Sequence, residues 1–210
     1  MSKNIFFISD THFGHENMLH FTNYDGTRMR PFDSIEELDE LMIQNWNEMV
    51  KPGDKIYHLG DCFYKCSNAD QIAKRLNGDK ILIKGNHDRR EAQWYLKYFR
   101  DVRATFHIDG NYLLSHFPIH PDSKGRFVRG LHGHIHAQTV MKPKYIHVTI
   151  PQAPSEDIIR VVGKEPDLWY RNCCVEVNNY APIPFEVIKQ ETEKLIEQGI
   201  IRIPPKREKG

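Results

Sequence analysis

The chain has 210 residues, of which 40% are hydrophobic and 27% are charged, and its net charge is +1. These values predict one globular domain with an ordinary hydrophobic core. The near-zero net charge gives no whole-molecule field that would favour a nucleic-acid partner. The apolar run at the N-terminus is too short for a signal peptide, and no stretch approaches the length of a membrane span. We therefore expect a cytoplasmic protein without a membrane partner.

The chain begins with a continuous apolar run, residues 5–8, as expected of a strand buried on both faces. Residues 11–33 show no clear periodicity and are predicted to form a long loop. Ser34 and Glu37 make a capping box. It opens a helix whose apolar residues repeat at helical spacing until residues 52–54 stop it.

Two further strands are predicted at residues 55–59 and 80–84. Between them, Asn68 is expected to cap a short helix that Gly78 closes. Another helix is predicted over residues 91–99. This alternation of strands and helices indicates an α/β layered domain.

The second half of the chain is predicted to consist of short strands at residues 112–115, 127–131 and 145–150, with a hairpin turn at Asp109-Gly110. Three prolines interrupt residues 151–170, where we expect at most one helical turn, after Ser155.

The last elements are a strand over residues 171–177 and a helix that Pro184 opens and Gly199 ends. Residues 204–210 are expected to be a flexible tail.

The four cysteines, Cys62, Cys66, Cys173 and Cys174, are expected to be reduced thiols. Cys173 and Cys174 are adjacent, so on a strand they would point to opposite faces and could not easily bridge each other. The alternative is a zinc site built on Cys62 and Cys66 with further partners.

Five short polar blocks occur in order along the chain: Asp10-Thr11-His12, Gly60-Asp61, Gly85-Asn86-His87-Asp88, Ser115-His116 and Gly133-His134-Ile135-His136. Each follows an apolar run that is predicted to be a strand. Strand ends can aim side chains from distant sequence positions at one point, so we expect a single site. Oxygen and imidazole donors without thiolates suit divalent metals such as Mn, Fe and Zn.

The order of these blocks resembles the calcineurin-like metallophosphoesterase superfamily, in particular its small members without a cap domain. The motifs span residues 10–136, and a weaker match continues around residues 172–184. One block alone is weak evidence, although Gly-Asn-His-Asp is fairly specific. The resemblance implies an α/β fold in which a layered β-sandwich is flanked by helices. It also implies a single domain over residues 1–203.

The resemblance implies a site for two divalent metal ions held by seven side chains: Asp10, His12 and His136 on the first ion, Asn86, His116 and His134 on the second, and Asp61 bridging both. A carboxylate can offer an oxygen to two cations, and neutral imidazoles keep the site electrophilic. Gly60, Gly85 and Gly133 are expected to let the backbone turn sharply beside these donors. Manganese is the expected metal, and Fe, Zn or Ni fit the same donors.

The implied reaction is hydrolysis of a phosphoester by in-line attack of a hydroxide held between the two metals. His87 would protonate the leaving group, and Asp88 would orient His87 and favour its charged form. Two alternatives stay open: His87 as a phosphate-binding group only, and Asp88 as the cap of the helix that follows.

Four further residues are candidates for substrate contact: His15, Asn17, Arg30 and Arg89. His15 and Asn17 follow the first block, with a surface loop as the alternative. Arg30 precedes a proline in a loop that could return to the cleft, and a guanidinium group suits a phosphate. Arg89 directly follows the Asn-His-Asp block. His58 and His132 are interpreted as core or supporting residues.

We predict a phosphodiesterase, because a short chain without a cap domain should have an open cleft that accepts a phosphate with two substituents. The alternative is a phosphomonoesterase, either a protein or a nucleotide phosphatase, in which residues 141–170 would form a lid. A nuclease with the same metal core is a further alternative. A non-catalytic scaffold is disfavoured because every expected metal donor is present. The expected partner is a small-molecule phosphoester; nucleic acid is not favoured, and the oligomeric state stays open.

Overall fold

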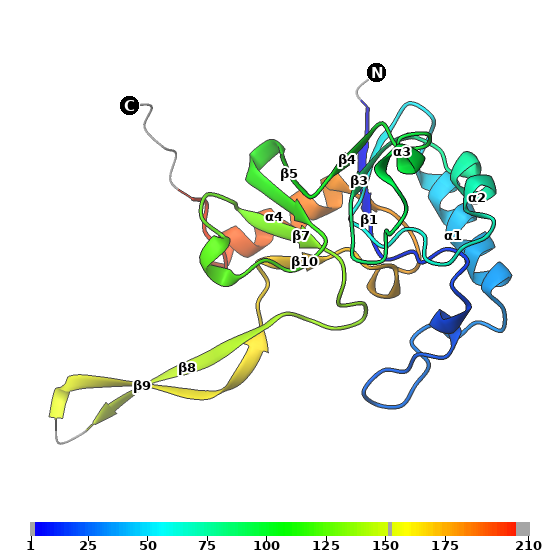
Figure 1. Ribbon diagram of the computed structural model, residues 1–210. Coiled ribbons are helices and arrows are strands. Elements are labelled where there is room, and N and C mark those ends of the chain that lie inside the picture. Colours follow the sequence, from blue (N-terminus) through cyan, green and yellow to red (C-terminus); the bar gives the residue numbers. More distant parts are fainter. Residues whose placement is uncertain (1–2, 151–152, 205–210) are drawn as a thin grey trace.

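The computed structural model describes residues 3–150 and 153–204, and its centre is built from two β-sheets (Figure 1). The first sheet has the order β11-β1-β2-β3-β4. Its strands are β1 (Ile5–Ile8), β2 (Lys55–His58), β3 (Asp79–Ile83), β4 (Asp101–Arg103) and β11 (Ile183–Pro184). The first four run parallel to their neighbours, and β11 is antiparallel to β1.

The second sheet has the order β10-β7-β6-β5. Its strands are β5 (Thr105–Ile108), β6 (Tyr112–Ser115), β7 (Arg129–His132) and β10 (Tyr170–Asn172). The strand β7 is parallel to both β6 and β10, whereas β5 and β6 form an antiparallel hairpin. The predicted hairpin turn is confirmed, because the 3-10 turn η2 (Asp109–Asn111) joins these two strands.

Four helices flank the sheets: α1 (Ile35–Met49), α2 (Ala69–Arg75), α3 (Ala92–Tyr95) and α4 (Phe185–Glu197). Short 3-10 turns occur at η1 (Glu16–Leu19), η3 (Pro121–Ser123) and η4 (Val175–Val177). Among the described residues, no helix has both the length and the apolar character that a bilayer crossing requires. Layered sheets between helices confirm the α/β sandwich that the sequence predicted.

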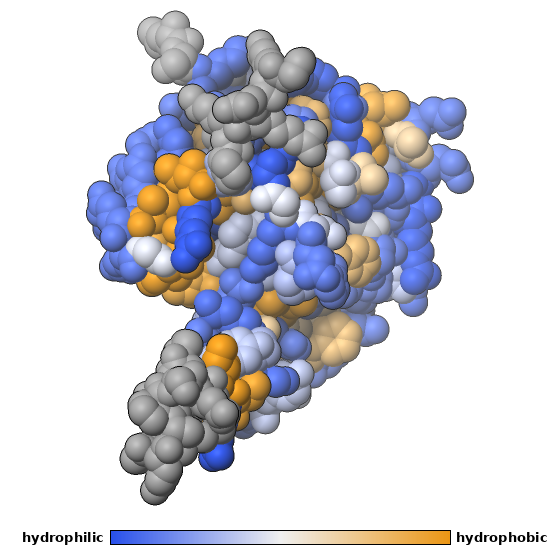
Figure 2. Space-filling view, turned by 90° about the vertical axis from the view of Figure 1, so that its left-hand side faces the viewer, coloured by the Kyte–Doolittle hydropathy of each residue, from blue (hydrophilic) through white to orange (hydrophobic). Residues whose placement is uncertain are grey.

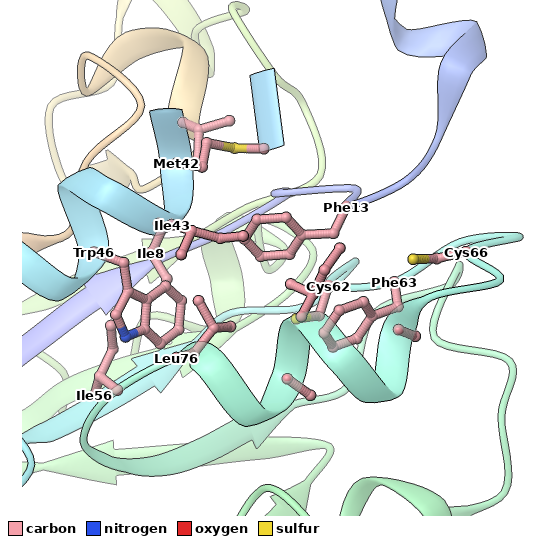
Figure 3. Close-up of a cluster of buried hydrophobic side chains, with 14 of the residues drawn as sticks. Ile8, Phe13, Met42, Ile43, Trp46, Ile56, Cys62, Phe63, Cys66 and Leu76 are labelled. Atoms are coloured by element: carbon pink, nitrogen blue, oxygen red, sulfur yellow. The ribbon is translucent and has the colours of Figure 1, made fainter. Parts of the chain in front are cut away.

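Alternating side chains along β1 pack the first sheet against the helices on one face and against the second sheet on the other. Phe6 and Ile8 belong to a buried cluster shared with α1 and α2, whereas Phe7 points to the opposite face, into a cluster shared with the second sheet. Figure 3 shows part of the first cluster, in which the Trp46 indole of α1 lies beside Ile56 of β2. β1 is an uninterrupted apolar run because both of its faces are buried.

The capping box is present at the start of α1. The Ser34 hydroxyl accepts a hydrogen bond from the Glu37 backbone N–H at 3.1 Å, and the helix runs to Met49. The helix predicted over residues 91–99 is shorter than expected, because α3 has four residues. The Arg100 N–H donates to the Lys80 carbonyl at 2.8 Å, so the chain must leave the helix to align β4 beside β3.

The strand predicted over residues 145–150 is confirmed as part of β8 (Met141–Ile150), whereas the helical turn expected after Ser155 is wrong. β8 pairs with β9 (Ala153–Pro166) in a long antiparallel ribbon. We call this ribbon the arm. Its strands pair only with each other within the described ranges, and it projects away from the two sheets (Figure 1).

The arm tolerates its prolines because every strand of a two-stranded ribbon is an edge strand. The β-branched residues Ile159, Val161 and Val162 favour the extended backbone. Their side chains are exposed, and Figure 2 shows hydrophobic surface on the arm.

The strand predicted over residues 171–177 ends early, at Asn172. The Asn172 side chain accepts from the Cys174 N–H at 2.9 Å and donates to the His136 carbonyl at 2.7 Å, so the chain bends there. The tail predicted over residues 204–210 lies outside the described residues from residue 205 onward.

All four cysteines are buried free thiols. The Cys66 thiol donates to the Asn68 side-chain oxygen at 3.0 Å. The groups of metal donors found among the described residues include neither Cys62 nor Cys66. The alternative of a zinc site at these cysteines therefore has no structural support.

Candidate metal centre

The polar blocks converge because the strands before them are parallel. Ile8 of β1 pairs with His58 of β2, and His58 pairs with Leu82 of β3, so the carboxyl ends of all three strands meet at one edge. Ligand sites of α/β sheets form outside this edge. The blocks after β6 and β7 reach the same region from the second sheet, and a bridge between Ser9 and Cys174 joins the two edges.

Two groups of donors lie at this junction. The first contains Asp10, His12 and His136, and the second contains Asp61, His116 and His134; within each group the donor atoms all lie within 4.8 Å of one another. The Nε2 atom of His12 is 3.8 Å from the Asp10 carboxylate, and that of His136 is 3.9 Å from it. Donors bound to one ion at about 2.1 Å are about 3–3.5 Å apart, so each group approaches this spacing.

Asp61 faces both groups. Its Oδ2 atom is 3.7 Å from the His12 Nε2 atom and 3.4 Å from the His116 Nε2 atom. The Asn86 side-chain oxygen lies 2.9 Å from the same His116 nitrogen, so Asn86 adjoins the second group. The expected bridging carboxylate and the expected amide donor are therefore both in position to contact metal.

The donor atoms fit divalent cations because several of them are buried and otherwise unpaired. Asp10 Oδ1 and both His12 ring nitrogens have no hydrogen-bond partner among the described residues. Burying an unpaired polar atom is costly, and a cation would supply the missing partner. Burial raises the pKa of Asp10 and lowers the pKa of His12 well below its usual value. His12 is therefore neutral, which is the form that binds metals.

The Asp61 carboxylate and the Nε2 atom of His116 face each other at 3.4 Å. Burial disfavours the charge on each, but their mutual hydrogen bond and attraction outweigh it, so the pKa of Asp61 is lowered and that of His116 is raised. The other ring nitrogen of His116 donates to the Leu59 carbonyl at 2.8 Å. This bond fixes the ring with Nε2 toward Asp61, as partners of metal-binding imidazoles do.

Left-handed backbone marks the candidate donors. Five of the seven have positive φ: Asp10 (57°), His12 (49°), Asp61 (57°), His134 (72°) and His136 (49°). A residue with a Cβ rarely adopts this conformation, which costs about 1–3 kcal/mol each. Strain concentrated on one set of side chains is typical of a functional site.

The three motif glycines serve two different purposes. Gly60 has a φ of 101° and provides the expected sharp turn. Gly85 and Gly133 are needed for space instead. A Cβ on Gly85 would collide with the Asp61 carboxylate, and one on Gly133 would collide with the Asp10 carboxylate.

Arg30 does not contact the cleft, so its expected role in binding substrate is wrong. Its side chain is 0% exposed. The guanidinium donates to Glu176 Oε1 at 2.6 and 2.9 Å and to the Thr11 carbonyl at 2.7 Å. It also donates to the carbonyl of Asp10, so Arg30 holds the left-handed turn that carries the first donors.

Glu176 is a supporting residue that the sequence analysis missed. Its Oε1 atom accepts from Nδ1 of His136 at 2.8 Å, which leaves Nε2 of His136 toward Asp10. Burial opposes its charge, but Arg30 and His136 outweigh burial and lower the pKa of Glu176 to about 2. Glu176 lies in the weaker family match around residues 172–184, which assigned it no role, so its contacts identify it.

Asp88 also differs from the expectation. Its buried carboxylate accepts backbone N–H groups of Asp61 (2.8 Å), Cys62 (3.0 Å) and Gly85 (2.9 Å). The described contacts of Asp88 do not include the His87 ring, and α3 begins later, at Ala92. Asp88 therefore ties the loop after β2 to the loop after β3, rather than orienting His87 or capping a helix.

His87 lies at the centre beside Tyr64, a residue that the sequence analysis did not single out. The two ring centroids are 4.6 Å apart, and the His12 ring is 5.4 Å from that of His87. The His87 backbone N–H donates to Asp61 Oδ1 at 2.7 Å, which ties its loop to the bridging carboxylate. The only signal for Tyr64 was its place three residues after Asp61.

The other three candidates for substrate contact differ in their exposure to solvent. His15 is buried between His12 and Tyr64, with ring centroids 5.6 and 4.7 Å away, so it is not part of an exposed loop. Arg89 is exposed, with its guanidinium 5.5 Å from the Tyr64 ring. Asn17 is exposed on η1, and no side-chain contact joins it to the donors within the described ranges.

His58 and His132 are core residues, as interpreted from the sequence. His58 contacts the Thr11 hydroxyl at 3.0 Å, and burial lowers its pKa to about 3. His132 donates to the Gly133 carbonyl at 2.8 Å, and burial lowers its pKa to about 4. Both rings are neutral supports behind the donor loops.

Two open cavities adjoin the donors. One, of about 530 Å³, is bounded by Gly85, His116 and Phe117 beside the second group. The other, of about 1250 Å³, includes His136 of the first group in its wall. Each group of donors therefore borders one open cavity.

The two-sheet α/β fold and the paired groups of oxygen and imidazole donors define a hydrolase of the two-metal class. The chain matches the family model for calcineurin-like phosphoesterases over residues 3–197, and it belongs to that family. Family membership and the donor groups together support a metal-dependent phosphoesterase with a dinuclear metal site.

The chain is also similar to individual proteins from other organisms. An uncharacterised protein of Methanocaldococcus jannaschii is 31% identical, over 94% of this chain and 93% of that protein. The gene 66 protein of Mycobacterium phage D29 is 32% identical, over 70% of this chain and 87% of its own length. A crystal structure of a protein of unknown function from Aquifex aeolicus has a TM-score of 0.58 at 23% identity. The match covers 90% of this chain and 100% of that one, and it shows the shared fold.

Proposed function

We propose that the protein is a phosphodiesterase that hydrolyses a small-molecule phosphodiester with two divalent metal ions, manganese being the expected metal. The proposed ligands are seven side chains: Asp10, His12 and His136 on the first ion, Asn86, His116 and His134 on the second, and Asp61 between them. Bound there, the two cations would supply the Lewis acidity that lowers the pKa of water and neutralises phosphoryl charge.

The residues around the donors keep this site electrophilic. His12 is neutral, so it adds no charge to a bound cation. The pKa of Asp61 is lowered, and an ionised carboxylate suits a shared ligand. Arg30 and Glu176 hold the Asp10 turn and the His136 ring in place, so the donors are preorganised.

His87 is proposed as the general acid that gives a proton to the leaving oxygen. Its loop is tied to Asp61 through its backbone N–H, and its ring packs on Tyr64 at the mouth of the site. The Nδ1 atom of His87 is buried without a hydrogen-bond partner among the described residues. Asp88 would act indirectly, because its carboxylate joins the loop after β2 to the loop after β3.

One observation carries the preference for diesters: each group of donors borders an open cavity. A phosphodiester has a substituent on each side of phosphorus, and each cavity offers room for one. The arm, which was considered as a lid that would favour monoesters, projects away from the sheets instead (Figure 1).

The test compares Mn²⁺-dependent hydrolysis of bis(p-nitrophenyl) phosphate and p-nitrophenyl phosphate, with chelator controls. We expect kcat/KM to favour the diester at least tenfold. On a diester with an alkyl leaving group, His87→Ala should lower kcat by about 10²–10⁴-fold while two Mn²⁺ remain bound. His120→Ala, at an exposed histidine, is the matched control. A preference for the monoester would contradict the diesterase assignment, and full activity of His87→Ala on the alkyl ester would exclude the acid role.

A further inference from the structure

The larger cavity is continuous with the metal centre and has a distinct lining. It opens between the loop of residues 20–29 and the segment of residues 135–141, with His136 in its wall. Because His136 is also a donor of the first group, a phosphoryl group at the centre would have one substituent beside this cavity. We call this cavity the side groove.

The loop that forms one wall of the side groove is preordered. A bridge pairs Thr22 with Arg28, and the Asn23 N–H donates to the Thr27 carbonyl at 2.8 Å. The Asp25 carboxylate accepts from the Thr27 N–H at 3.0 Å and from its hydroxyl at 2.6 Å. A turn held in this way keeps its backbone in place before any ligand arrives, which reduces the entropy lost on binding.

This turn displays two aromatic rings in the side groove. Tyr24 is 94% exposed and Phe21 is 46% exposed. Phe21 is also the end of a row of rings that begins at the centre. Its centroid is 6.4 Å from that of His15, which is 4.7 Å from that of Tyr64. A row of rings therefore extends from Tyr64, beside His87, to Phe21 in the groove.

The polar residues of the side groove disfavour a second anionic group. Its lining contains no lysine or arginine among the described residues, and it contains the acidic side chain of Asp25. The opposite wall contributes the exposed Gln138 and Thr139, and Asn23 supplies an amide from the loop. Flat apolar rings beside amide and hydroxyl groups match an uncharged planar group with hydrogen-bonding edges, as a nucleobase has.

We infer that the side groove binds the nucleoside substituent of a phosphodiester substrate, with the base stacked on Phe21 and Tyr24. This inference rests on the proposed phosphodiesterase function. The volume of about 1250 Å³ exceeds what one nucleoside needs, and the groove remains open to solvent, so a mononucleoside ester can enter without movement of the sheets.

Two substrates with the same leaving group test the inference: thymidine 5′-(p-nitrophenyl) phosphate and methyl p-nitrophenyl phosphate, each with Mn²⁺. We expect the wild type to prefer the thymidine ester at least tenfold in kcat/KM. Phe21→Ala and Tyr24→Ala should each lower kcat/KM for that ester about tenfold, because one stacked ring is lost. Hydrolysis of the methyl ester should change less than twofold. Tyr145→Ala is the matched control, since Tyr145 is 57% exposed on the arm and outside the groove.

Equal kcat/KM for the two esters in the wild type, or equal losses on both in the variants, would overturn the inference. Hydrolysis of the methyl ester would still support the phosphodiesterase, so the two failures are distinguishable. Calorimetric titration with thymidine 5′-monophosphate tests the groove without turnover. Tyr24→Ala should weaken its Kd about tenfold, and an unchanged Kd would again overturn the inference. Melting temperatures equal to that of the wild type would show that the variants are folded.

Discussion

At the scale of single residues, Arg30 and Glu176 explain how strained donors are held in place. Asp10 and His12 have left-handed backbone, and the Arg30 guanidinium binds the carbonyls within that turn. The Arg30–Glu176 pair is buried at 2.6 Å, and the same Glu176 oxygen accepts from His136. One carboxylate therefore joins the turn after β1 to the donor loop of the second sheet.

Glu176→Gln should weaken Mn²⁺ binding at the first group by about 10–100-fold, because the His136 ring loses its charged partner. It should also reduce the free energy of unfolding by about 3–5 kcal/mol, since Arg30 would stay buried without a counter-charge. Titration calorimetry and urea unfolding measure the two effects. Glu191→Gln is the matched control, because Glu191 pairs with Arg129 and Arg171 away from the donors. Unchanged metal affinity in Glu176→Gln would show that the His136 ring needs no carboxylate.

At the scale of elements, the parallel strands decide where the chemistry lies. The loops after β1, β2 and β3 carry Asp10, Asp61 and Asn86 to one edge, and those after β6 and β7 carry His116 and His134 to the same place. The arm belongs to neither of these two sheets, because β8 and β9 pair only with each other in the described part of the chain. The Asp167 N–H donates to the Val140 carbonyl at 2.8 Å and closes the base of the arm.

Replacing residues 143–164 by a short Gly-Ser turn should therefore leave the body of the protein intact. We expect the melting temperature to change by no more than about 4 °C, the change that about 1 kcal/mol produces in a protein of this size. Hydrolysis of methyl p-nitrophenyl phosphate should be retained. Circular dichroism on heating measures the first quantity, and a loss of more than 10 °C would mean that the arm stabilises the two sheets.

At the scale of the whole molecule, the candidate metal centre joins the two sheets. Asp10 and His12 follow a strand of the first sheet, whereas His134 and His136 follow a strand of the second. Cations bound between them would cross-link the sheets in the folded state only, and ligands that bind only the folded state stabilise it.

Mn²⁺ should accordingly raise the melting temperature, and a chelator should lower it. At free metal about 100 times Kd, one site contributes about 2.7 kcal/mol, which corresponds to roughly 5–10 °C here. Asp61→Asn should reduce this metal-dependent shift, because the shared carboxylate is lost, whereas His120→Ala should retain it. Differential scanning calorimetry with and without Mn²⁺ makes the comparison. An identical shift in melting temperature for Asp61→Asn and wild type would show that Asp61 does not bind the metal.

Features that depend on local chemistry were predictable from the residues alone. The apolar runs before Asp10, Asp61 and Asn86 identified buried strands, because burial on both faces demands such runs. The capping box at Ser34 identified the start of α1, because its hydrogen bond closes within three residues. The donor types, read in their family order, predicted the positions that the structure brings together.

Features that depend on distant contacts and on burial could be found only in the folded chain. Arg30 meets Glu176 across 146 positions of sequence, so no local pattern distinguishes a buried brace from a phosphate-binding arginine. Asp88 binds backbone N–H groups of another loop, which its neighbours in sequence do not reveal. The second strand of the arm, β9, was missed because prolines normally exclude a strand, and only pairing between two edge strands makes them acceptable.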